Sequence, residues 1–170
     1  GRQGLAAAQR YPEDFDGILS GAPAIYWTEY VVAELWPQVV MKEAGYYLSA
    51  CERDAFVEAS IQACDKADHV RDSVITEPLK CRFDPFTLVG RKTRCHKGSI
   101  TINRKAASVV SSIWAGPRTS TGRKLWYGML RGASLSDLAR TKEVNGTTRG
   151  DPFFVADTWV RDFVKADPSF

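Results

Sequence analysis

The feature that most constrains how this 170-residue chain can fold is its set of four cysteines. None of them has the close Cys-x-x-Cys spacing of a zinc or redox site, so disulfide bonds are the better interpretation. Three complete pairings are possible, and buried free thiols in a cytosolic protein are the competing explanation. The four residues are Cys51, Cys64, Cys81 and Cys95.

An acidic segment follows the second cysteine. Calcium accepts six to eight carboxylate and carbonyl oxygens in a flexible loop, so this segment could wrap one ion, although its spacing is not that of an EF-hand. The competing interpretation is a solvated acidic turn with helix-capping aspartates, since His69 and Arg71 lower the negative charge. A Cys64–Cys81 bridge would close a loop of roughly 16 residues, stabilise the fold by ~3 kcal/mol and hold the candidate ligands together. Those ligands are the side chains of Asp65, Asp68 and Asp72 and the carbonyls of Val70 and Val74.

Composition and charge exclude several classes of protein. The chain is 44% hydrophobic with five Trp, too apolar for a disordered segment, so it should fold as about one globular domain. No apolar stretch approaches the ~20 residues of a membrane span. The net charge is only +3, and the basic residues form no more than one modest cluster. Nucleic-acid binding is therefore a poor prediction. That cluster consists of Arg91, Lys92, Arg94, His96 and Lys97.

The N-terminal residues predict an α/β unit. Residues 4–10 are rich in Ala and precede Tyr11-Pro12, which predicts a short helix that ends before the proline. Residues 15–23 form an apolar run between turn formers, which predicts a buried strand followed by a loop. The chain opens with Gly1 and not with Met, so we expect it to be a piece of a longer protein.

The rest of the chain is predicted to be mostly helical. A run over residues 25–43 should be broken or kinked by Pro37 and ended by Gly45. Ser49 and Glu52 have capping-box spacing at the start of a helix that is predicted to extend to Cys64. Further helices are predicted from 101, with Thr101 as the cap, to Gly116-Pro117, and over 153–164. Residues 119–122 predict a turn, with a hairpin after it, and residues 144–151 predict a polar loop that holds the glycosylation sequon 145–147.

No catalytic residues are predicted within the chain. Its two histidines, His69 and His96, lie in polar segments without an adjacent serine motif, so no Ser-His-Asp triad can be assembled. No phosphate-binding loop or Gly-rich dinucleotide fingerprint is present either. Each histidine is best interpreted as an ordinary surface residue.

The first 24 residues, GRQGLAAAQRYPEDFDGILSGAPA, closely resemble the fungal and bacterial tannase and feruloyl esterase family. Several later segments are similar to the lid domain of that family, so the resemblance spans nearly the whole chain. They are the Cys-Asp-x-x-Asp run at 64–68, residues 78–85 around Cys81, Trp-Ala-Gly-Pro at 114–117 and Asp-Pro-Phe-Phe at 151–154.

The resemblance implies an α/β class fold. Residues 1–38 would be part of an α/β-hydrolase core, and residues 39–170 a mostly helical lid domain with short strands and a calcium loop. The catalytic serine would lie just before Gly1, and the acid and histidine of the triad would follow Phe170. The chain itself would therefore hold no catalytic residue.

The resemblance also implies a structural calcium in the lid, bound by Asp65, Asp68 and Asp72 with the carbonyls of Val70 and Val74. Two departures from the family pattern stand out. The family usually has glycine where His69 and Ser73 stand, and its usual cysteine near residues 89–90 is missing. Cys95 therefore either pairs with Cys51 or both stay free.

The expected function is that of a secreted serine carboxylic ester hydrolase, acting through an acyl-enzyme on small aromatic esters, feruloyl or galloyl, or on plant cell-wall or tannin esters. No nucleic-acid or membrane partner is expected. The first alternative is a non-catalytic, calcium-stabilised binding module. The second is a cytosolic, thiol-bearing α/β protein.

Overall fold

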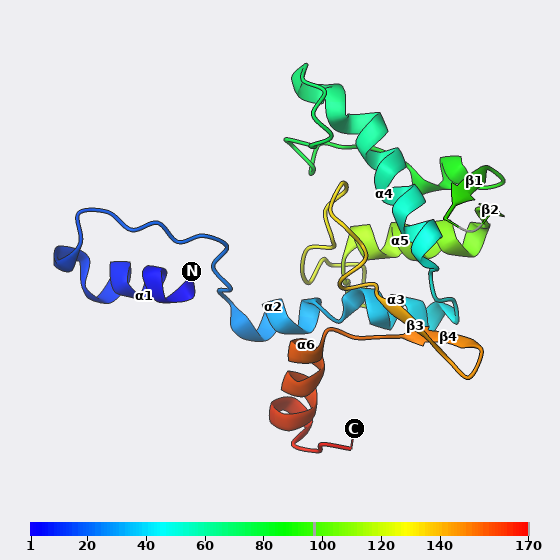
Figure 1. The fold of residues 1–170 in the computed structure, drawn as a ribbon. Helices are drawn as coiled ribbons and strands as arrows, with labels where there is room; N and C mark the ends of the chain where they lie inside the picture. Colours follow the sequence, from blue (N-terminus) through cyan, green and yellow to red (C-terminus); the bar gives the residue numbers. More distant parts are fainter. Residues whose placement is uncertain (97, 170) are drawn as a thin grey trace.

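The computed structural model describes residues 1–96 and 98–169, and Figure 1 shows an extended N-terminal arm beside a folded body. We define the arm as residues 1–30 and the body as residues 31–150. Helix α1 lies apart from the body and is joined to it by an extended segment, while α6 continues below the body toward the C-terminus. The helices are α1 (Arg2–Arg10), η1 (Pro12–Asp14), α2 (Trp27–Ala33), α3 (Trp36–Ala44), α4 (Ala50–Cys64), η2 (Asp65–Asp68), η3 (Pro85–Leu88), α5 (Arg104–Ala115), α6 (Phe154–Trp159) and the π-helix η4 (Val160–Lys165), and the strands are β1 (Lys92–Cys95), β2 (Gly98–Thr101), β3 (Thr141–Val144) and β4 (Thr147–Gly150).

The core of the body forms around α5, which packs against α3 and η3. Helix α5 buries apolar side chains at helical spacing, as its sequence predicts. Phe56 of α4 and Met41 of α3 are fully buried in the same cluster. The core is therefore made by helices, with the strands at its margin.

A hydrogen-bonded network joins the starts of α4 and α5. The capping box predicted for α4 is confirmed: Ser49 accepts from the backbone N–H of Glu52, and the Glu52 carboxylate accepts from the backbone N–H of Ser49. Tyr46 donates its hydroxyl proton to Glu52 at 2.5 Å and accepts from the Asn103 amide, also at 2.5 Å. Asn103 also caps α5 by accepting from the backbone N–H of Ala106. One continuous series of hydrogen bonds therefore holds the starts of both helices.

The cap predicted at Thr101 is wrong by two residues. Thr101 belongs to β2 and is paired with Lys92 in the ladder, so its backbone is already committed to a strand. The helix instead begins after Asn103, and it ends at Gly116, as predicted. The helix predicted over residues 25–43 is broken, as expected, but at residues 34–35, with Pro37 in the first turn of α3 and Gly45 as its C-cap.

Both hairpins are antiparallel and local, and neither was expected as such. Residues 144–151, predicted as a polar loop, instead contain β4, paired with β3. Asn145 and Gly146 both have positive φ (52° and 72°), which matches the Asn-Gly pair of a two-residue hairpin turn. That dipeptide is the sequence signal that outweighs the polar composition of the segment.

The hairpin expected around the turn at 119–122 is present only in minimal form. Gly122 donates to the carbonyl of Thr119, and Arg118 and Lys124 form an antiparallel bridge. The N–H of Thr119 donates to the carbonyl of Arg123, and the N–H of Leu125 donates to that of Pro117. The following residues, 125–127, have no regular structure and bring aromatic side chains to the surface. The last helix is confirmed as α6 and η4.

The buried strand predicted within residues 15–23 is not found. These residues have no regular strand structure, Phe15 is 54% exposed and Leu19 is fully exposed. A strand needs a hydrogen-bonding neighbour, and the described strands pair only within their own hairpins, β1 with β2 and β3 with β4. The described structure is thus mostly helical, with short strands.

Both disulfides of the body are formed. Cys64 pairs with Cys81, as predicted, and Cys51 pairs with Cys95, which was one of the two alternatives left open. The first bond closes the acidic segment, and the second ties α4 to β1. None of the described helices is long and apolar enough to cross a membrane.

Candidate functional site: an acidic loop and an aromatic surface

The acidic loop follows directly from the end of α4. Cys64 is the last residue of that helix, η2 continues it through Asp68, and the disulfide to Cys81 holds the two ends of the loop with Cα atoms 5.6 Å apart. Figure 1 shows this loop at the far end of α4, at the edge of the body. The expected ligands therefore lie on one short, covalently closed segment.

Each predicted carboxylate ligand accepts a backbone hydrogen bond from within the loop. Asp65 Oδ1 accepts from the N–H of Asp72 at 3.3 Å, Asp68 Oδ1 from Val70 at 2.9 Å and Asp72 Oδ1 from Val74 at 3.0 Å. Asp68 also accepts from the Thr76 hydroxyl. That hydroxyl, together with the backbone N–H of Val70, holds the pKa of the Asp68 carboxyl below its usual value, so it stays ionised.

The two departures from the family pattern occupy special backbone positions. His69 has φ of 71° and Ser73 has φ of 65°, both in the left-handed region. Glycine adopts this region without steric cost, whereas the Cβ atom of His or Ser makes it less favourable. The path of the loop therefore requires at both positions a backbone conformation that favours glycine.

The donor chemistry of this loop suits a calcium ion, but the carboxylates do not converge as they stand. Within residues 1–96 and 98–169, no three or more His, Cys, Asp or Glu side chains are arranged in this structure as a metal site. Asp65 and Asp72 each bind the loop through Oδ1, which leaves Oδ2 as the atom that could turn toward an ion. Binding would thus require these carboxylates and the carbonyls of Val70 and Val74 to turn toward a common point.

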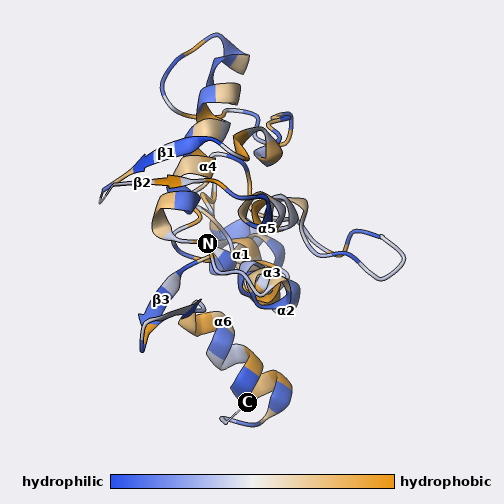
Figure 2. Cartoon of the chain, turned by 90° about the vertical axis from the view of Figure 1, so that its right-hand side faces the viewer, coloured by the Kyte–Doolittle hydropathy of each residue, from blue (hydrophilic) through white to orange (hydrophobic). Residues whose placement is uncertain are grey.

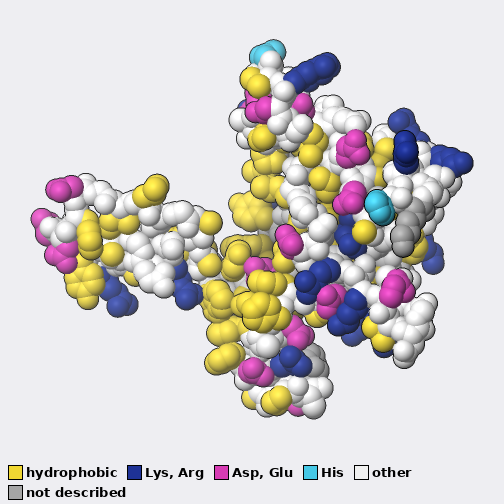
Figure 3. Space-filling view, viewed as in Figure 1, with side chains coloured by type: hydrophobic (Ala, Val, Ile, Leu, Met, Phe, Trp, Pro, Cys, Tyr) yellow, Lys and Arg dark blue, Asp and Glu magenta, His cyan; other side chains and the backbone are white. Residues whose placement is uncertain are grey.

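An aromatic surface runs over three segments of the molecule. Trp27 packs edge-on against Trp159 with ring centroids 5.6 Å apart, which joins α2 to α6. Tyr26 contacts Trp126 at 6.4 Å, which joins the start of α2 to residues 124–130. Figure 3 shows the hydrophobic side chains as a continuous band between the arm and the body. We define this aromatic surface as Tyr26, Trp27, Tyr30, Trp126, Tyr127, Trp159 and Phe163.

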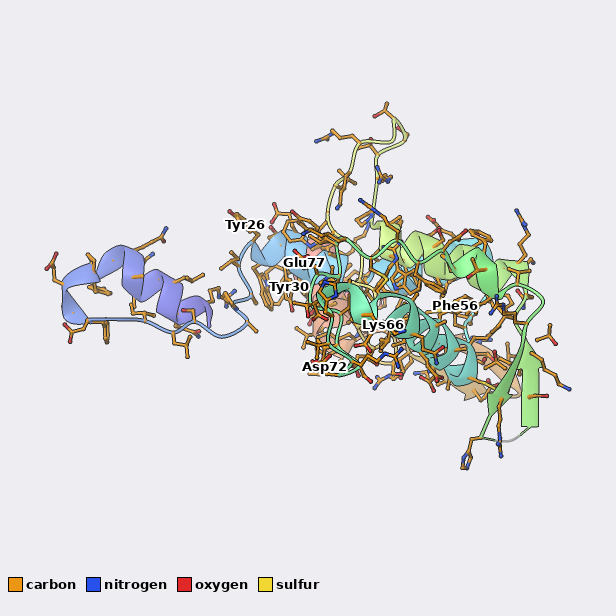
Figure 4. The ribbon with its side chains drawn as sticks, turned by 90° about the horizontal axis from the view of Figure 1, so that it is seen from above. Tyr26, Tyr30, Phe56, Lys66, Asp72 and Glu77 are labelled. Atoms are coloured by element: carbon orange, nitrogen blue, oxygen red, sulfur yellow. A yellow bond between two sulfur atoms is a disulfide. The ribbon has the colours of Figure 1, made fainter. Side chains whose placement is uncertain are left out.

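A half-buried carboxyl group, that of Glu34, lies next to Tyr30 of the aromatic surface. Glu34 ends α2, and burial raises the pKa of its carboxyl above the usual value. The neighbouring Tyr30 also has a raised pKa, mainly because of burial, with Glu34 adding to the effect. Figure 4 labels Tyr26 and Tyr30 close together at the junction of arm and body.

A hollow of about 580 Å³ lies between the acidic loop and the aromatic surface. One wall is formed by residues 76–80, just before Cys81, and the opposite wall by Tyr127, Gly128 and Leu130. Leu79 and Tyr127 are 65% and 59% exposed, so two apolar side chains face solvent here. The hollow could receive a flat apolar group, and the disulfide of the acidic loop steadies one of its walls.

Sequence analysis missed these surface residues. The sequence predicts a hairpin at Leu125-Trp126-Tyr127 and assigns no surface role to the aromatic side chains of this run. The sequence signal for an exposed aromatic loop was the position of this run directly after the turn at 119–122. By contrast, His69 and His96 are exposed, as expected of ordinary surface residues.

Comparison with known proteins places the chain in a family. The family model "Tannase and feruloyl esterase" matches residues 1–154. The chain belongs to the tannase and feruloyl esterase family. The resemblance carried by residues 1–24 and by the later segments is thereby confirmed.

Individual members of the tannase and feruloyl esterase family agree with this assignment. The chain is 44% identical over 170 residues, all of its length and 32% of the relative's, to a probable feruloyl esterase of Arthroderma benhamiae. It is 33% identical over 103 residues, 59% of this chain and 18% of the relative, to a tannase of Aspergillus oryzae. The solved tannin acyl hydrolase from Aspergillus niger superposes with a TM-score of 0.89 at 28% identity, covering 99% of this chain and 32% of that one.

Two consequences follow from these comparisons. The chain spans about a third of the length of the feruloyl esterase and tannin acyl hydrolase that it matches along its whole length. The matched proteins carry the names of ester hydrolases, and none of the comparisons supports a non-catalytic binding module.

Proposed function

We propose that this chain is part of a serine carboxylic ester hydrolase that acts through an acyl-enzyme on aromatic esters of the feruloyl or galloyl type. The observation that carries the proposal is the agreement along nearly the whole chain with the tannin acyl hydrolase structure and the tannase and feruloyl esterase family. In this proposal the serine, the acid and the histidine belong to other parts of the protein. In this proposal the residues of this chain shape the binding surface for the substrate and provide no catalytic group.

The aromatic surface supports this proposal from the side of substrate binding. A phenolic ring is flat and apolar with polar edges, and such rings pack edge-on or offset against aromatic side chains. The hollow beside Tyr127 offers an apolar wall of that kind. We propose that this chain covers the reacting ester and contributes the hollow to the binding of its aromatic part.

The proposal divides the chain into two parts. Residues 1–38 would belong to an α/β-hydrolase core and residues 39–170 to a lid over the active site. The exposure of Leu19 and Phe15 is consistent with this division, because apolar side chains of a core segment require further elements to cover them.

Calcium would act structurally in this proposal. The ligands are Asp65, Asp68 and Asp72 with the carbonyls of Val70 and Val74. An ion there would replace the mutual repulsion of the carboxylates by attraction and would order the wall of the hollow. It would touch no reacting atom.

Secretion completes the proposal. The two disulfides favour an oxidising compartment, and the sequon residue Asn145 lies exposed at the tip of the β3–β4 hairpin, where a glycan would meet no other element. We propose that the protein is extracellular and glycosylated at this tip, and that its substrates are small aromatic esters or plant cell-wall or tannin esters.

The test is an assay of the full-length protein with methyl ferulate and methyl gallate. We expect hydrolysis of at least one of them, and no hydrolysis by residues 1–170 alone, since no triad lies within them. Tyr127→Ala should raise KM with little change in kcat, whereas Tyr11→Ala, similarly exposed at 57%, is the control. Failure of the full-length protein to hydrolyse any aromatic ester would overturn the proposal.

The calcium proposal has its own test. Calcium should raise the Tm of the full-length protein and chelation should lower it, because a ligand that binds only the folded state stabilises that state. Asp68→Ala should remove this response, and Asp84→Ala, which removes an aspartate capping η3 outside the loop, should keep it. If chelation leaves Tm unchanged and Asp68→Ala melts like the wild type, the loop is a solvated acidic turn.

A further inference from the structure

The β1–β2 hairpin carries a charged face that the proposed hydrolysis does not use. In the antiparallel register, Lys92 lies opposite Thr101 and Arg94 lies opposite Ser99, so these four side chains share one face of the ribbon. All four are exposed. We define this set, Lys92, Arg94, Ser99 and Thr101, as the basic face.

The opposite face of the same hairpin anchors it to the body. Cys95 forms the disulfide to Cys51 of α4, and Ile100 packs against the hydrophobic core. The pairing continues beyond the strands, since Ile102 donates to the carbonyl of Arg91 and Gly90 donates to the carbonyl of Ile102. The basic face is therefore held on a fixed ribbon, so little conformational entropy would be lost when it binds a partner.

Within the described part of the chain, no salt bridge neutralises the positive charge of the basic face. No Asp or Glu occurs between residues 85 and 105 of the sequence. Among the described residues, neither Lys92 nor Arg94 forms a salt bridge, and Arg91 next to them forms none either. In Figure 3 dark blue side chains gather at the right-hand edge of the molecule, over β1 and β2.

The second hairpin shows that this lack of partners is particular to β1–β2. The β3–β4 hairpin also carries exposed cations, but Asp151 binds Lys142 at 3.0 Å and Arg140 at 2.5 Å. Glu143 lies on the same hairpin and accepts from Thr148. Two hairpins of the same length thus differ in whether their positive charge is balanced within the protein.

The side chains of the basic face select the chemistry of its partner. Two cations flanked by two hydroxyl groups can bind carboxylates and sugar hydroxyls, and a guanidinium group binds a carboxylate through two parallel hydrogen bonds. The face has no aromatic side chain on which nucleic-acid bases could stack, and no aliphatic side chain that could enter a membrane. Figure 2 shows β1 with hydrophilic colouring.

We propose that the basic face binds a polysaccharide that bears uronic acid carboxylates. It lies on the side of the body away from the arm and from the aromatic surface, as Figures 1 and 3 show, so a bound polymer would leave that surface free. The polymer is thereby tethered to the protein without occupying the hollow beside Tyr127. This inference goes beyond the proposed hydrolysis and does not depend on it.

The test is binding of polygalacturonate to the full chain, with fully methyl-esterified polygalacturonate as the matched uncharged polymer. We expect binding of the first polymer only, and loss of that binding as salt screens the exposed charges. Lys92→Gln combined with Arg94→Gln should weaken it roughly tenfold, since each exposed charge contact contributes about a threefold factor. The control is Arg123→Gln combined with Arg149→Gln, which removes two exposed cations outside the β1–β2 hairpin.

Three results would overturn the inference. One is equal binding of the esterified polymer, and another is an equal loss of binding in the control double variant. The third is tighter binding of single-stranded DNA or of phosphatidylserine vesicles, because it would identify a partner of another class. Hydrolysis of methyl ferulate by the full-length protein is measured separately, and the Lys92→Gln and Arg94→Gln variant should leave it unchanged.

Discussion

The N-terminal arm and the body of this chain contain similar fractions of apolar residues but bury them very differently. No residue between 1 and 30 is buried, and Leu19 is fully exposed. The body encloses a core around α5 and closes two disulfides around it. The comparison teaches that apolar side chains are buried only where neighbouring elements reach them, as they do around α5 and not around Leu19.

The largest change in the free energy of unfolding is expected from a substitution in the core of the body. Phe56→Ala should lower the free energy of unfolding by about 3–5 kcal/mol, because a fully buried ring is replaced by a cavity. In the arm, Leu19→Ala should change it by less than about 0.5 kcal/mol in the same chain. Urea unfolding followed by circular dichroism measures both, and equal losses would show that the arm is packed in solution.

A somewhat smaller effect is expected at the acidic loop. Replacing Cys64 and Cys81 by Ser should lower stability by about 3 kcal/mol, since the unfolded chain regains the entropy of an open loop. The loop should also become the first site of limited proteolysis, ahead of the β1–β2 hairpin, which keeps its own disulfide. Cleavage in the arm at an unchanged rate is the internal control. An unchanged unfolding curve would contradict a structural role for this bond.

The network between the starts of α4 and α5 should contribute less. Tyr46→Phe removes the hydroxyl group that links Glu52 to Asn103 and should cost about 1.5 kcal/mol, as expected for a hydrogen bond to a charged group. Tyr47→Phe, which alters an adjacent tyrosine outside this network, is the matched control.

This network also has a pH dependence of defined sign. Burial, with the hydrogen bond to Glu52, raises the pKa of Tyr46 to about 12. A raised pKa means that the stabilisation is complete below the unfolded value near 10 and is lost as pH rises through 12. Tyr46→Phe should therefore flatten the fall in stability above pH 10. An identical fall in the variant and the wild type would contradict this contribution.

The smallest effect is expected where the β3–β4 hairpin joins the body. Lys142 and Arg140 hold the pKa of the Asp151 carboxyl below its usual value. A lowered pKa gives stabilisation that is present above the unfolded value near 3.9 and lost as pH falls through the folded value. Asp151→Asn should remove that part of the acid dependence and cost less than about 1 kcal/mol at neutral pH. Glu143→Gln, in the same hairpin, is the control in the acid titration.

Helix starts and stops were well determined by the local sequence, because their signals act over a few residues. The capping box of Ser49 and Glu52, the break near Pro37 and the ends at Gly45 and Gly116 all depend on the local backbone. The Cys64–Cys81 bond was predicted because the two cysteines bracket one short segment. The family, too, could be recognised from short runs of residues.

Other features depended on contacts between distant segments, and these only the tertiary structure decided. Residues 15–19 have the pattern of a strand, yet no neighbouring strand is described beside them, so the pattern alone could not make one. Cys51 and Cys95 are paired because α4 and β1 pack together. The aromatic surface joins α2, residues 124–130 and α6, which no local pattern connects. Side-chain patterns in sequence fix local geometry, whereas surfaces and pairings require the long-range packing that brings the elements together.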